Sequence, residues 1–535
     1  MDKRRTPGVR KNSGGAAVKS TLAVTLFLLL SKVLGLVRDM VITANFGAGT
    51  VTDAYNMAYG LPTMIQLGIT ACITATFIPS YTRIRKQGRR GADRFTSQML
   101  NITMLFALVL VCVIMLFAPA VSRFIAPSYK GEVFELTVEY VRLMMPMVVF
   151  MAGMIVLQGL LNANNSYSMP QVVSLPTNIF MVVFVLLFSS DMGGISLPIS
   201  AMIGFSLQFF FILPFGLRKF RYSFSFGFRS RDIRAALRLM VPALFSTGVS
   251  EVNMMVDRML SSGLGESSVS AITYSNRLTG FVTGTVVTAI LTVIYSRLSE
   301  YAADKNDRGR KKLKSTFSAG MNLMLAVLMP VTVVCYMFPR ELVSVVFQRG
   351  LFDEAATDIT TYAFCFYLPV MFFAAVRDMT TRMFFSLRDT KTPTVNGVIS
   401  LIINILLNII LVRFLGLAGL AVASSVAIIV ACGLLFLSLR RKIGRLGIKR
   451  IIRELIKLIP ALVIQAVVML IIKSFMAGHN LIFMLAATVS AGLLAFVITA
   501  YISRSQSVRE LIDMIALKIA KILYKLLFAR KNKKR

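Results

Sequence analysis

The sequence predicts an all-α integral membrane protein with about fourteen transmembrane helices. Three observations lead to this fold class. Hydrophobic residues make up 56% of the 535-residue chain and charged residues only 16%, whereas soluble proteins carry about 25% charged residues. Apolar runs of about 20 residues, each long enough to cross a bilayer, recur from end to end. Basic residues gather in short loops between these runs.

The charge balance is strongly basic, with 59 Lys and Arg against 24 Asp and Glu and a net charge of +35. In a soluble protein this excess would indicate nucleic-acid binding, but no soluble basic domain is present. The positive-inside rule and contacts with anionic lipid headgroups explain it better. Zinc chemistry and a Ser-His-Asp triad are not expected, because His479 is the only histidine and the five cysteines lack metal-ligand spacing.

Fourteen apolar segments are expected to cross the membrane. They comprise residues 21–46, 53–82, 97–121, 134–162, 170–189, 195–217, 237–262, 268–296, 315–337, 357–387, 394–413, 417–439, 455–475 and 480–502. The first segment is expected to be retained, because no signal-peptide cleavage site is evident.

The loop charges support this count. Loops on one side hold basic clusters within 83–90, 218–231, 297–312, 388–391 and 440–445, and loops on the other side carry at most two basic residues each. Because this alternation holds through all fourteen segments, both termini are expected in the cytoplasm. The C-terminal segment mixes apolar and basic residues, which predicts an amphipathic helix on the inner leaflet.

Charged positions recur within the chain. Lys32 matches Glu251 and Asp39 matches Arg258, both at an offset of about 219 residues. Six spans separate the matched positions, so the two copies have the same orientation and predict two six-helix lobes related by an axis along the membrane normal. The predicted organisation is a basic tail (1–20), a first lobe (21–225), a second lobe (226–445), two extra transmembrane helices (446–505) and a basic amphipathic tail (506–535).

Ionisable residues inside the spans are candidates for function, because burying a charge in a membrane is costly. The basic ones are Lys32, Arg38, Arg258, Arg277, Arg377 and Arg382, and the acidic ones are Asp39, Asp53, Glu251, Asp257 and Asp378. Arginine is suited to bidentate recognition of phosphate. A cavity that holds several arginines, only partly neutralised, favours an anionic substrate such as a phosphate or diphosphate.

Local pairing is the alternative explanation for some of these charges. Lys32 and Asp39 are seven residues apart and share a helix face, so they form a candidate self-neutralised pair, with Arg38 pointing elsewhere. Asp53 follows a glycine-rich turn, where capping of a helix N-terminus would explain it.

The tenth span offers a similar alternative. Asp378 and Arg382 stand at positions i and i+4, a spacing at which opposite charges pair on a helix. Arg377 would then have no evident local partner, and its charge would be available to a substrate.

A cation site is a further candidate. Asn404 and Asn408 share one helix face, and Ser424 lies in the next span. Together with Asp257 they could supply oxygen ligands to a hard monovalent cation. Ordinary polar packing between membrane helices is the alternative.

Several motifs resemble the MurJ family, the MviN-type lipid II flippases of the MOP exporter superfamily. The first is the run Ser31-Lys32-Val33-Leu34-Gly35-Leu36-Val37-Arg38-Asp39, followed by Phe46-Gly47-Ala48-Gly49, Thr52-Asp53-Ala54-Tyr55 and Leu61-Pro62. Weaker matches are Tyr274-Ser275-Asn276-Arg277-Leu278 and Asp389-Thr390-Lys391-Thr392-Pro393. The resemblance covers nearly the whole chain.

The resemblance implies a multi-pass protein of the bacterial inner membrane that moves lipid II to the outer leaflet by alternating access, for cell-wall synthesis and cell shape. It implies a central cavity between the lobes and a lipid-tail groove at the two extra helices. The implied partners are lipid II, membrane lipids and the cell-wall synthesis machinery, and Na⁺ is the implied coupling ion, with no other cofactor.

The family's residues map onto this chain as follows. The cavity positions implied by the resemblance are Lys32, Arg38, Asp53 and Arg277, and the implied cation site is Asp257, Asn404, Asn408 and Ser424. The sequence departs from the family at four positions. Lys32 and Gln66 stand where an arginine is frequent, and Asn276 and Asn408 stand where an acid is frequent. We expect Arg377 and Arg382 to supply cavity charge in their place, with Asp39, Glu251 and Arg258 as additional charges.

Other function classes fit less well. A flippase for another polyprenyl-diphosphate-linked saccharide remains open, and a drug/cation antiporter of the same superfamily would favour a cavity dominated by carboxylates. A membrane enzyme acting on polyprenyl-linked substrates would need a carboxylate–metal cluster or a catalytic histidine. A scaffold would not need so many buried charges. No Gly-x-x-x-x-Gly-Lys-Ser/Thr loop occurs, so ATP is not expected to drive transport.

Overall fold

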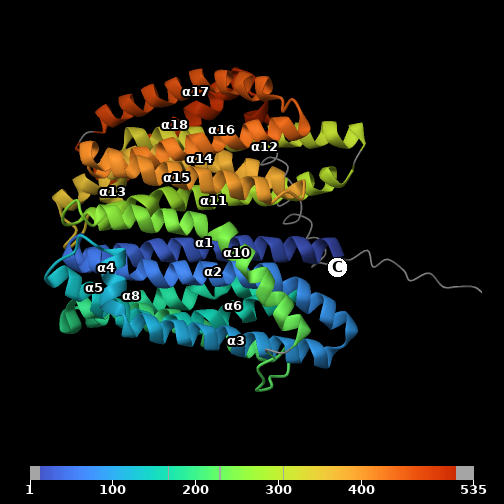
Figure 1. The fold of residues 1–535 in the computed structure, drawn as a ribbon. Helices are drawn as coiled ribbons and strands as arrows, with labels where there is room; N and C mark the ends of the chain where they lie inside the picture. The colour runs from blue at the N-terminus through green and yellow to red at the C-terminus, as the bar shows by residue number, and fades with distance from the viewer. Residues whose placement is uncertain (1–12, 167, 228–229, 305, 477, 514–535) are drawn as a thin grey trace, which may run out of the picture. The chain divides into compact units, whose positions relative to one another are not determined.

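The computed structural model describes residues 13–166, 168–227, 230–304, 306–476 and 478–513 (Figure 1). Within these ranges every regular element is a helix. The chain divides into two compact units: Met1–Ser270 with Arg349–Ala356, and Ala271–Gln348 with Thr357–Arg535. The lobe boundaries expected from the sequence stay a prediction.

The first unit is built around α2. Its helices are α1 (Ser13–Phe46), α2 (Thr50–Gln87), α3 (Arg89–Leu116), α4 (Ala118–Ile125), α5 (Glu132–Met144), α6 (Met147–Ala163), α7 (Ser168–Val172), α8 (Ser174–Met192), the 3-10 turn η1 (Gly193–Ile195), α9 (Ser196–Leu217) and α10 (Arg231–Ser261). α2 packs against α3, α5, α6 and α10, whereas α1 packs against α7 and α8.

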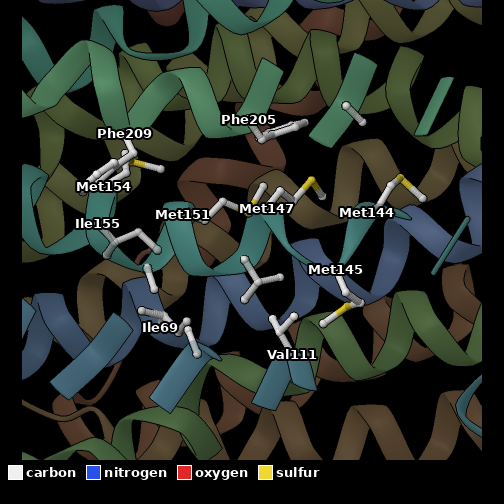
Figure 2. Packing of buried hydrophobic residues seen from close by; sticks show 14 of the residues in the cluster. Ile69, Val111, Met144, Met145, Met147, Met151, Met154, Ile155, Phe205 and Phe209 are labelled. Carbon is white, nitrogen blue, oxygen red and sulfur yellow. The ribbon is translucent and has the colours of Figure 1, made fainter. Parts of the chain in front are cut away.

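The core of this unit is rich in methionine (Figure 2). Met147, Met151 and Met154 of α6 belong to one buried cluster with Phe205 and Phe209 of α9. Methionine side chains are flexible enough to fill the irregular gaps between crossing helices. The two helices approach closely at Gly153, where a Cβ would come within 2.6 Å of the Phe209 ring. A small residue at this crossing therefore sets the distance between α6 and α9.

The second unit consists mainly of long helices packed in pairs. It contains α11 (Ser268–Ala303), α12 (Asp307–Met337), α13 (Pro339–Phe347), α14 (Glu354–Ser386), α15 (Lys391–Leu415), α16 (Leu417–Ile443), α17 (Ile448–Phe475) and α18 (Leu481–Ile502), of which α11 and α14 each begin with residues of the first unit. α15 pairs with α16 and α17 with α18, and α12 packs against α17. α17 exposes a row of aliphatic side chains, including Ile452, Ile456 and Ile459, as expected of a lipid-facing surface.

The number of spans differs from the sequence prediction. By length and composition, nine helices within the described ranges could cross a membrane, or up to eleven if each of two bent pairs is one span. Fourteen spans are therefore not confirmed. One of the nine is the 50-residue stretch Ser168–Leu217, which contains α8 and α9. These two helices pack against each other, so this stretch holds two of the predicted spans.

One predicted span is bent by its own sequence. Residues 134–162 form two helices, α5 and α6, which meet at an angle of 41°. Pro146 lies between them and adopts a helical backbone. Proline lacks an N–H and its ring clashes with the preceding helical turn, so a bend at this position is expected.

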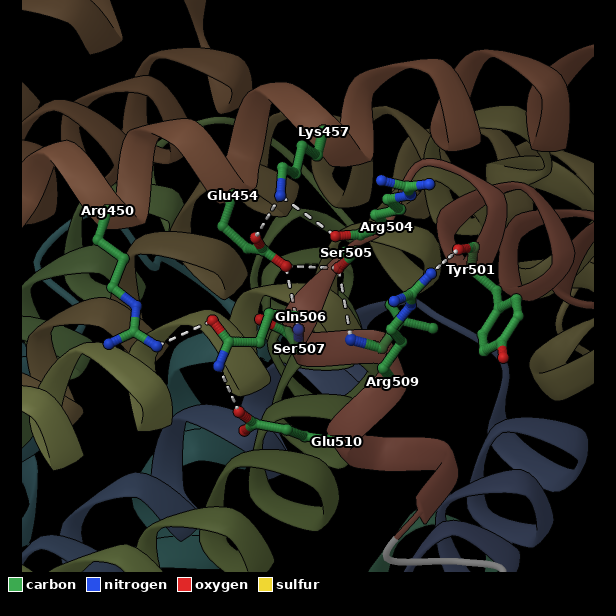
Figure 3. Close-up of polar contacts among 11 residues, drawn as sticks. Arg450, Glu454, Lys457, Tyr501, Arg504, Ser505, Gln506, Ser507, Arg509 and Glu510 are labelled. Carbon is green, nitrogen blue, oxygen red and sulfur yellow. Dashed lines mark hydrogen bonds and ion pairs between the residues drawn. The ribbon is translucent and has the colours of Figure 1, made fainter.

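The chain after α18 is held against the second unit (Figure 3). Glu454 of α17 is 6% exposed and accepts hydrogen bonds from the Ser505 hydroxyl (2.6 Å) and the Ser507 N–H (3.0 Å). Val508 packs in a buried cluster with residues of α17 and α18. The predicted C-terminal helix thus begins at Gln506, and the rest of that prediction, from residue 514 onward, lies outside the described part of the chain.

Candidate functional site

Arg38 and Asp39 form a buried ion pair on α1. The Nε and Nη2 atoms of Arg38 lie 3.1 and 2.9 Å from the same oxygen, Oδ1, of Asp39. The two side chains are 15% and 6% exposed. Nη1 of Arg38 donates to Oδ1 of Asn178 on α8, at 3.2 Å. Three nitrogens of one guanidinium group are therefore engaged by two neighbours, which fixes its orientation.

A polar stripe on α1 explains why Arg38 points toward α8. Ser31, Arg38 and Asn45 are seven residues apart and thus share one helix face. Ser31 accepts a hydrogen bond from Ser174 at 3.0 Å, and Asn45 accepts one from Ser189 at 3.1 Å. Such interhelical hydrogen bonds hold membrane helices together.

The structure corrects one sequence prediction here. The alternative of a self-neutralised pair between Lys32 and Asp39 does not hold, because the Asp39 carboxylate pairs with Arg38. The guanidinium group is long enough to fold back along the helix onto the adjacent residue, so the 100° between neighbouring positions does not separate them. Lys32 is half-buried on α1, and its predicted role in the cavity stays a prediction.

Asp53 lies in the first turn of α2 and is 2% exposed. Its Oδ1 accepts the backbone N–H of Ser270, at 2.8 Å, in the first turn of α11. The Ser270 hydroxyl accepts a hydrogen bond from Asn56 (3.2 Å) and donates to Thr52 (3.1 Å). Asp53 thus caps a helix, as one interpretation of the sequence expected, but the helix is α11 and not its own.

Three further candidates lie on α10. Glu251 and Arg258 are half-buried and Asp257 is 3% exposed. Arg258 packs over Gly60 of α2, where an added Cβ would overlap the guanidinium group. A glycine on α2 therefore makes room for this arginine between two packed helices, which is one reason why a bulky charge can be accommodated there.

In the second unit, Arg377 and Asp378 of α14 form an ion pair. Nε and Nη2 of Arg377 lie 3.0 and 2.9 Å from Oδ1 of Asp378. The predicted Asp378–Arg382 pair is wrong, because Arg382 instead lies over the ring of Tyr295, with its Cζ 5.4 Å from the centroid. Arg377 therefore has a local partner, although none was expected from the sequence. As with Arg38, its side chain reaches the carboxylate of the next residue.

Arg277 of α11 is half-buried in the second unit. Its Cζ lies 5.9 Å from the centroid of the Tyr274 ring, on the same helix. An aromatic face stabilises a cation without neutralising its charge. The contact with Tyr274 therefore does not itself neutralise Arg277.

The predicted cation site is divided between the units. Asn404 donates to the Ser424 hydroxyl at 3.1 Å, and Asn408 donates to Oδ1 of Asn404 at 2.8 Å. The three side chains are at most 8% exposed and offer neutral oxygen atoms, the ligand type that hard cations prefer. Asp257, the acidic member, belongs to the first unit, so a four-residue site stays a prediction.

Two residues that hold the candidate charges were not identified from the sequence. Asn178 and Ser270, which hold Arg38 and Asp53, were not among the candidates. They are 140 and 217 residues from their partners, and neither belongs to a motif. A polar amide near the start of the apolar α8 was the available indication for Asn178.

Comparison with known proteins matches this arrangement to one family. The sequence profile of the family described as "Lipid II flippase MurJ" matches residues 42–490. A probable lipid II flippase MurJ from Rickettsia prowazekii is 25% identical over 90% of this chain and 97% of its own length. The lipid II flippase MurJ of Burkholderia cenocepacia is 26% identical over 79% of this chain and 84% of its own length.

The solved structures agree in fold. A lipid II flippase MurJ in an inward closed conformation has a TM-score of 0.78 at 22% identity, covering 92% of this chain and all of that chain. An inward-facing multidrug resistance MATE transporter of the MOP superfamily follows at a TM-score of 0.65 and 16% identity, covering 79% and 98%. The chain is a multi-pass helical membrane protein, and because the family's profile matches most of its length, it belongs to the lipid II flippase MurJ family.

Proposed function

We propose that this protein is a lipid II flippase, which moves the lipid-linked peptidoglycan precursor from the cytoplasmic to the outer leaflet for cell-wall synthesis. The observation that carries the proposal is the presence of partly exposed arginines inside membrane-spanning helices. The Arg377 side chain is 39% exposed within α14, and Arg382 beside it is exposed as well. Charges at such positions face a polar path through the membrane rather than lipid.

The chemistry of these groups suits a diphosphate. Arginine remains protonated at every physiological pH and offers planar pairs of N–H donors, which match phosphate oxygens. Arg277 and Arg382 rest on aromatic rings, so neither charge is cancelled by that contact. In the first unit, Lys32 and Arg38 would offer further positive charge to such a headgroup. A cationic drug would instead favour a surface dominated by carboxylates.

Transport requires the binding surface to open to each side in turn. A headgroup carrying sugars and phosphates cannot cross the apolar layer unaided, whereas its polyprenyl tail can stay in lipid beside the extra helices α17 and α18. We place the protein in the bacterial inner membrane with both termini in the cytoplasm, because the basic loops alternate with the spans. Lipid II, membrane lipids and the cell-wall synthesis machinery are the partners that this role requires.

Return of the empty carrier requires an ion or the membrane potential. A ligand drives a conformational cycle only if its affinity differs between the two states. The buried oxygens of Asn404, Asn408 and Ser424 fit a co-transported monovalent cation such as Na⁺, and Asp257 would supply the charge that attracts it. The potential acting on the cavity arginines is the alternative driving force, worth about 2.3 kcal/mol per charge at 100 mV.

The first experiment measures lipid II on each leaflet of cells depleted of this protein. We expect the precursor to be made and to accumulate on the cytoplasmic side, whereas loss of a biosynthetic enzyme would leave it unmade. Arg277→Ala should abolish translocation at normal protein levels, because a charge-assisted hydrogen bond to a phosphate contributes about 1.5–3 kcal/mol. Full complementation by well-expressed Arg277→Ala would contradict the role of this residue.

The coupling ion is tested separately. Translocation is followed in intact cells while the membrane potential is collapsed and external sodium is varied, for the wild type and for Asp257→Ala. Unchanged flipping without either gradient would reject the coupling, and wild-type activity of Asp257→Ala would reject the site.

A further inference from the structure

Two chain corners interlock at one end of the first unit. The corner between α1 and α2 contains Ala48 and Thr50, and the corner between α10 and α11 contains Glu266 and Ser267. Oε1 of Glu266 accepts both the backbone N–H (3.1 Å) and the hydroxyl (2.9 Å) of Thr50. The Ser267 hydroxyl donates to the carbonyl oxygen of Ala48 at 2.6 Å.

The contacts are reciprocal. Glu266 places a carboxylate on the first N–H of α2, while Asp53 of α2 places its carboxylate on the N–H of Ser270 in α11. Each helix start thus receives a carboxylate from the other corner. A negative group at this position satisfies a free N–H and is favoured by the helix dipole. Neither cap can form unless the two corners meet.

The spacing of these contacts matches the internal repeat. The hydrogen bonds that Glu266 accepts and that Ser267 and Ser270 donate join residues 216, 219 and 217 apart in the chain. The charged positions of α1 and α10 recur at an offset of about 219. The contacts therefore join equivalent positions of the predicted repeat, and a movement of one corner relative to the other acts on them directly.

The α10–α11 corner has an unusual backbone at Ser267, and a third segment, residues 349–352, contacts the end of α1 beside it. Ser267 has a φ of 69°, a left-handed backbone that residues other than glycine seldom adopt without a local contact to hold it. The turn at residues 349–352 also reaches this corner, where the Leu351 N–H donates to the Ala44 carbonyl oxygen at 2.9 Å. A left-handed Gly350 (φ 57°) permits this approach, since an added Cβ would overlap Ala44.

We propose that Glu266 is a gating residue, which together with Asp53 forms a reciprocal pair of cross-caps that close this end of the protein and break when it opens. The inference rests on the proposed function for its role in transport. In the proposed topology the corner lies on the outer side, so its opening accompanies release of the cargo to the outer leaflet. Glu266 acts through the position of α2 and does not contact the cargo.

The test measures access to the closed corner. Val269, next to the capped Ser270, is fully buried. In a variant free of native cysteines, Val269→Cys is exposed to a membrane-impermeant maleimide in intact cells. We expect Glu266→Ala to speed labelling about fivefold, because a cap contact contributes about 1 kcal/mol and 1.4 kcal/mol is a factor of ten. Glu266→Gln should speed labelling less than Glu266→Ala, since its amide oxygen still accepts both donors but the charge that the helix dipole favours is lost.

Glu139→Ala is the matched control, because Glu139 is an exposed glutamate on α5 of the same unit and should not alter labelling. Ser268→Cys provides a second reporter in case Val269→Cys fails to fold. An unchanged labelling rate in Glu266→Ala, or an equal rise in Glu139→Ala, would overturn the proposal. Labelling measures access to the corner and does not depend on the cargo. If Glu266→Ala speeds labelling as expected but lipid II translocation does not depend on this protein, only the proposed function is rejected.

Discussion

Two Arg-Asp dipeptides on different helices adopt the same local geometry in opposite surroundings. In Arg38–Asp39 and in Arg377–Asp378, the Nε and Nη2 atoms of the arginine both approach Oδ1 of the next residue. The first pair is 15% and 6% exposed, and the second is 39% and 43% exposed. Asn178 additionally holds Arg38, whereas the side chains of Arg377 and Asp378 stand open on α14.

This difference separates two uses of the same motif. In the buried pair the carboxylate compensates a charge that is largely shielded from water, so removal of one partner leaves a mostly buried ion without its counter-charge. In the open pair water screens both charges, and the ion pair itself contributes little. The buried pair therefore fixes a guanidinium group in place, and the open pair leaves one available to a passing anion.

The strongest test of this comparison is the loss of each carboxylate. Asp39→Ala should lower the free energy of unfolding by about 3–5 kcal/mol, because Arg38 would stay buried without its partner. Asp378→Ala should lower it by less than about 1 kcal/mol. Denaturant unfolding of the purified protein in detergent measures both. Equal costs would show that exposure does not distinguish the two pairs.

Replacing each arginine by lysine tests geometry at constant charge. Arg38→Lys should reduce lipid II translocation about tenfold or more, because a single ammonium group cannot reproduce three directed N–H contacts, a difference of about 1.4 kcal/mol. Arg377→Lys should remain within about twofold of wild type, since charge alone would serve there. Rates are compared at matched expression. Greater damage from Arg377→Lys would reverse the assignment of roles.

Thiol accessibility sharpens the same contrast. In a variant free of native cysteines, Arg377→Cys and Arg382→Cys should react with a water-soluble thiol reagent in at least one conformation, because these positions are expected to line the cavity. Asp39→Cys should react at least about tenfold more slowly, as expected of a buried site that opens only rarely. Complete protection of 377 and 382 in every state would place them in a closed packing interface.

The sequence predicted the class of fold and the residue types of the site, but not the partners. Apolar run lengths revealed a helical membrane protein, since length and hydropathy are local properties. Helix spacing offered Lys32–Asp39 and Asp378–Arg382 as alternative pairs, and neither forms, because an arginine can reach the carboxylate that follows it in sequence. Asn178 could not be assigned to Arg38, because nothing local encodes a contact across 140 residues.

Another Arg-Asp dipeptide, Arg388–Asp389, lies outside the spans, between α14 and α15, and is expected to show the smallest effect. Arg388 has a left-handed backbone (φ 58°), and the Asp389 carboxylate forms its ion pair with Lys442 of α16. It also accepts the N–H (3.0 Å) and the hydroxyl (2.8 Å) of Thr392 at the start of α15. The left-handed turn at Arg388 therefore accompanies an ion pair between Asp389 and Lys442 in place of one between Asp389 and the adjacent arginine.

Partial burial acts to raise the pKa of Asp389, but the hydrogen bonds from Lys442 and Thr392 outweigh it and hold the pKa below its usual value. A lowered pKa in the folded state means that the carboxylate stabilises the protein above its unfolded pKa of about 3.9, and that this contribution is lost as the pH falls through the folded value. Asp389→Asn should therefore cost about 1 kcal/mol near neutral pH and progressively less below about pH 4. Unfolding of both proteins across this range, with Lys442→Gln completing a double-mutant cycle, measures the effect. If the difference in free energy of unfolding between the two proteins were constant with pH, the charge of the Asp389 carboxylate would play no part in stability.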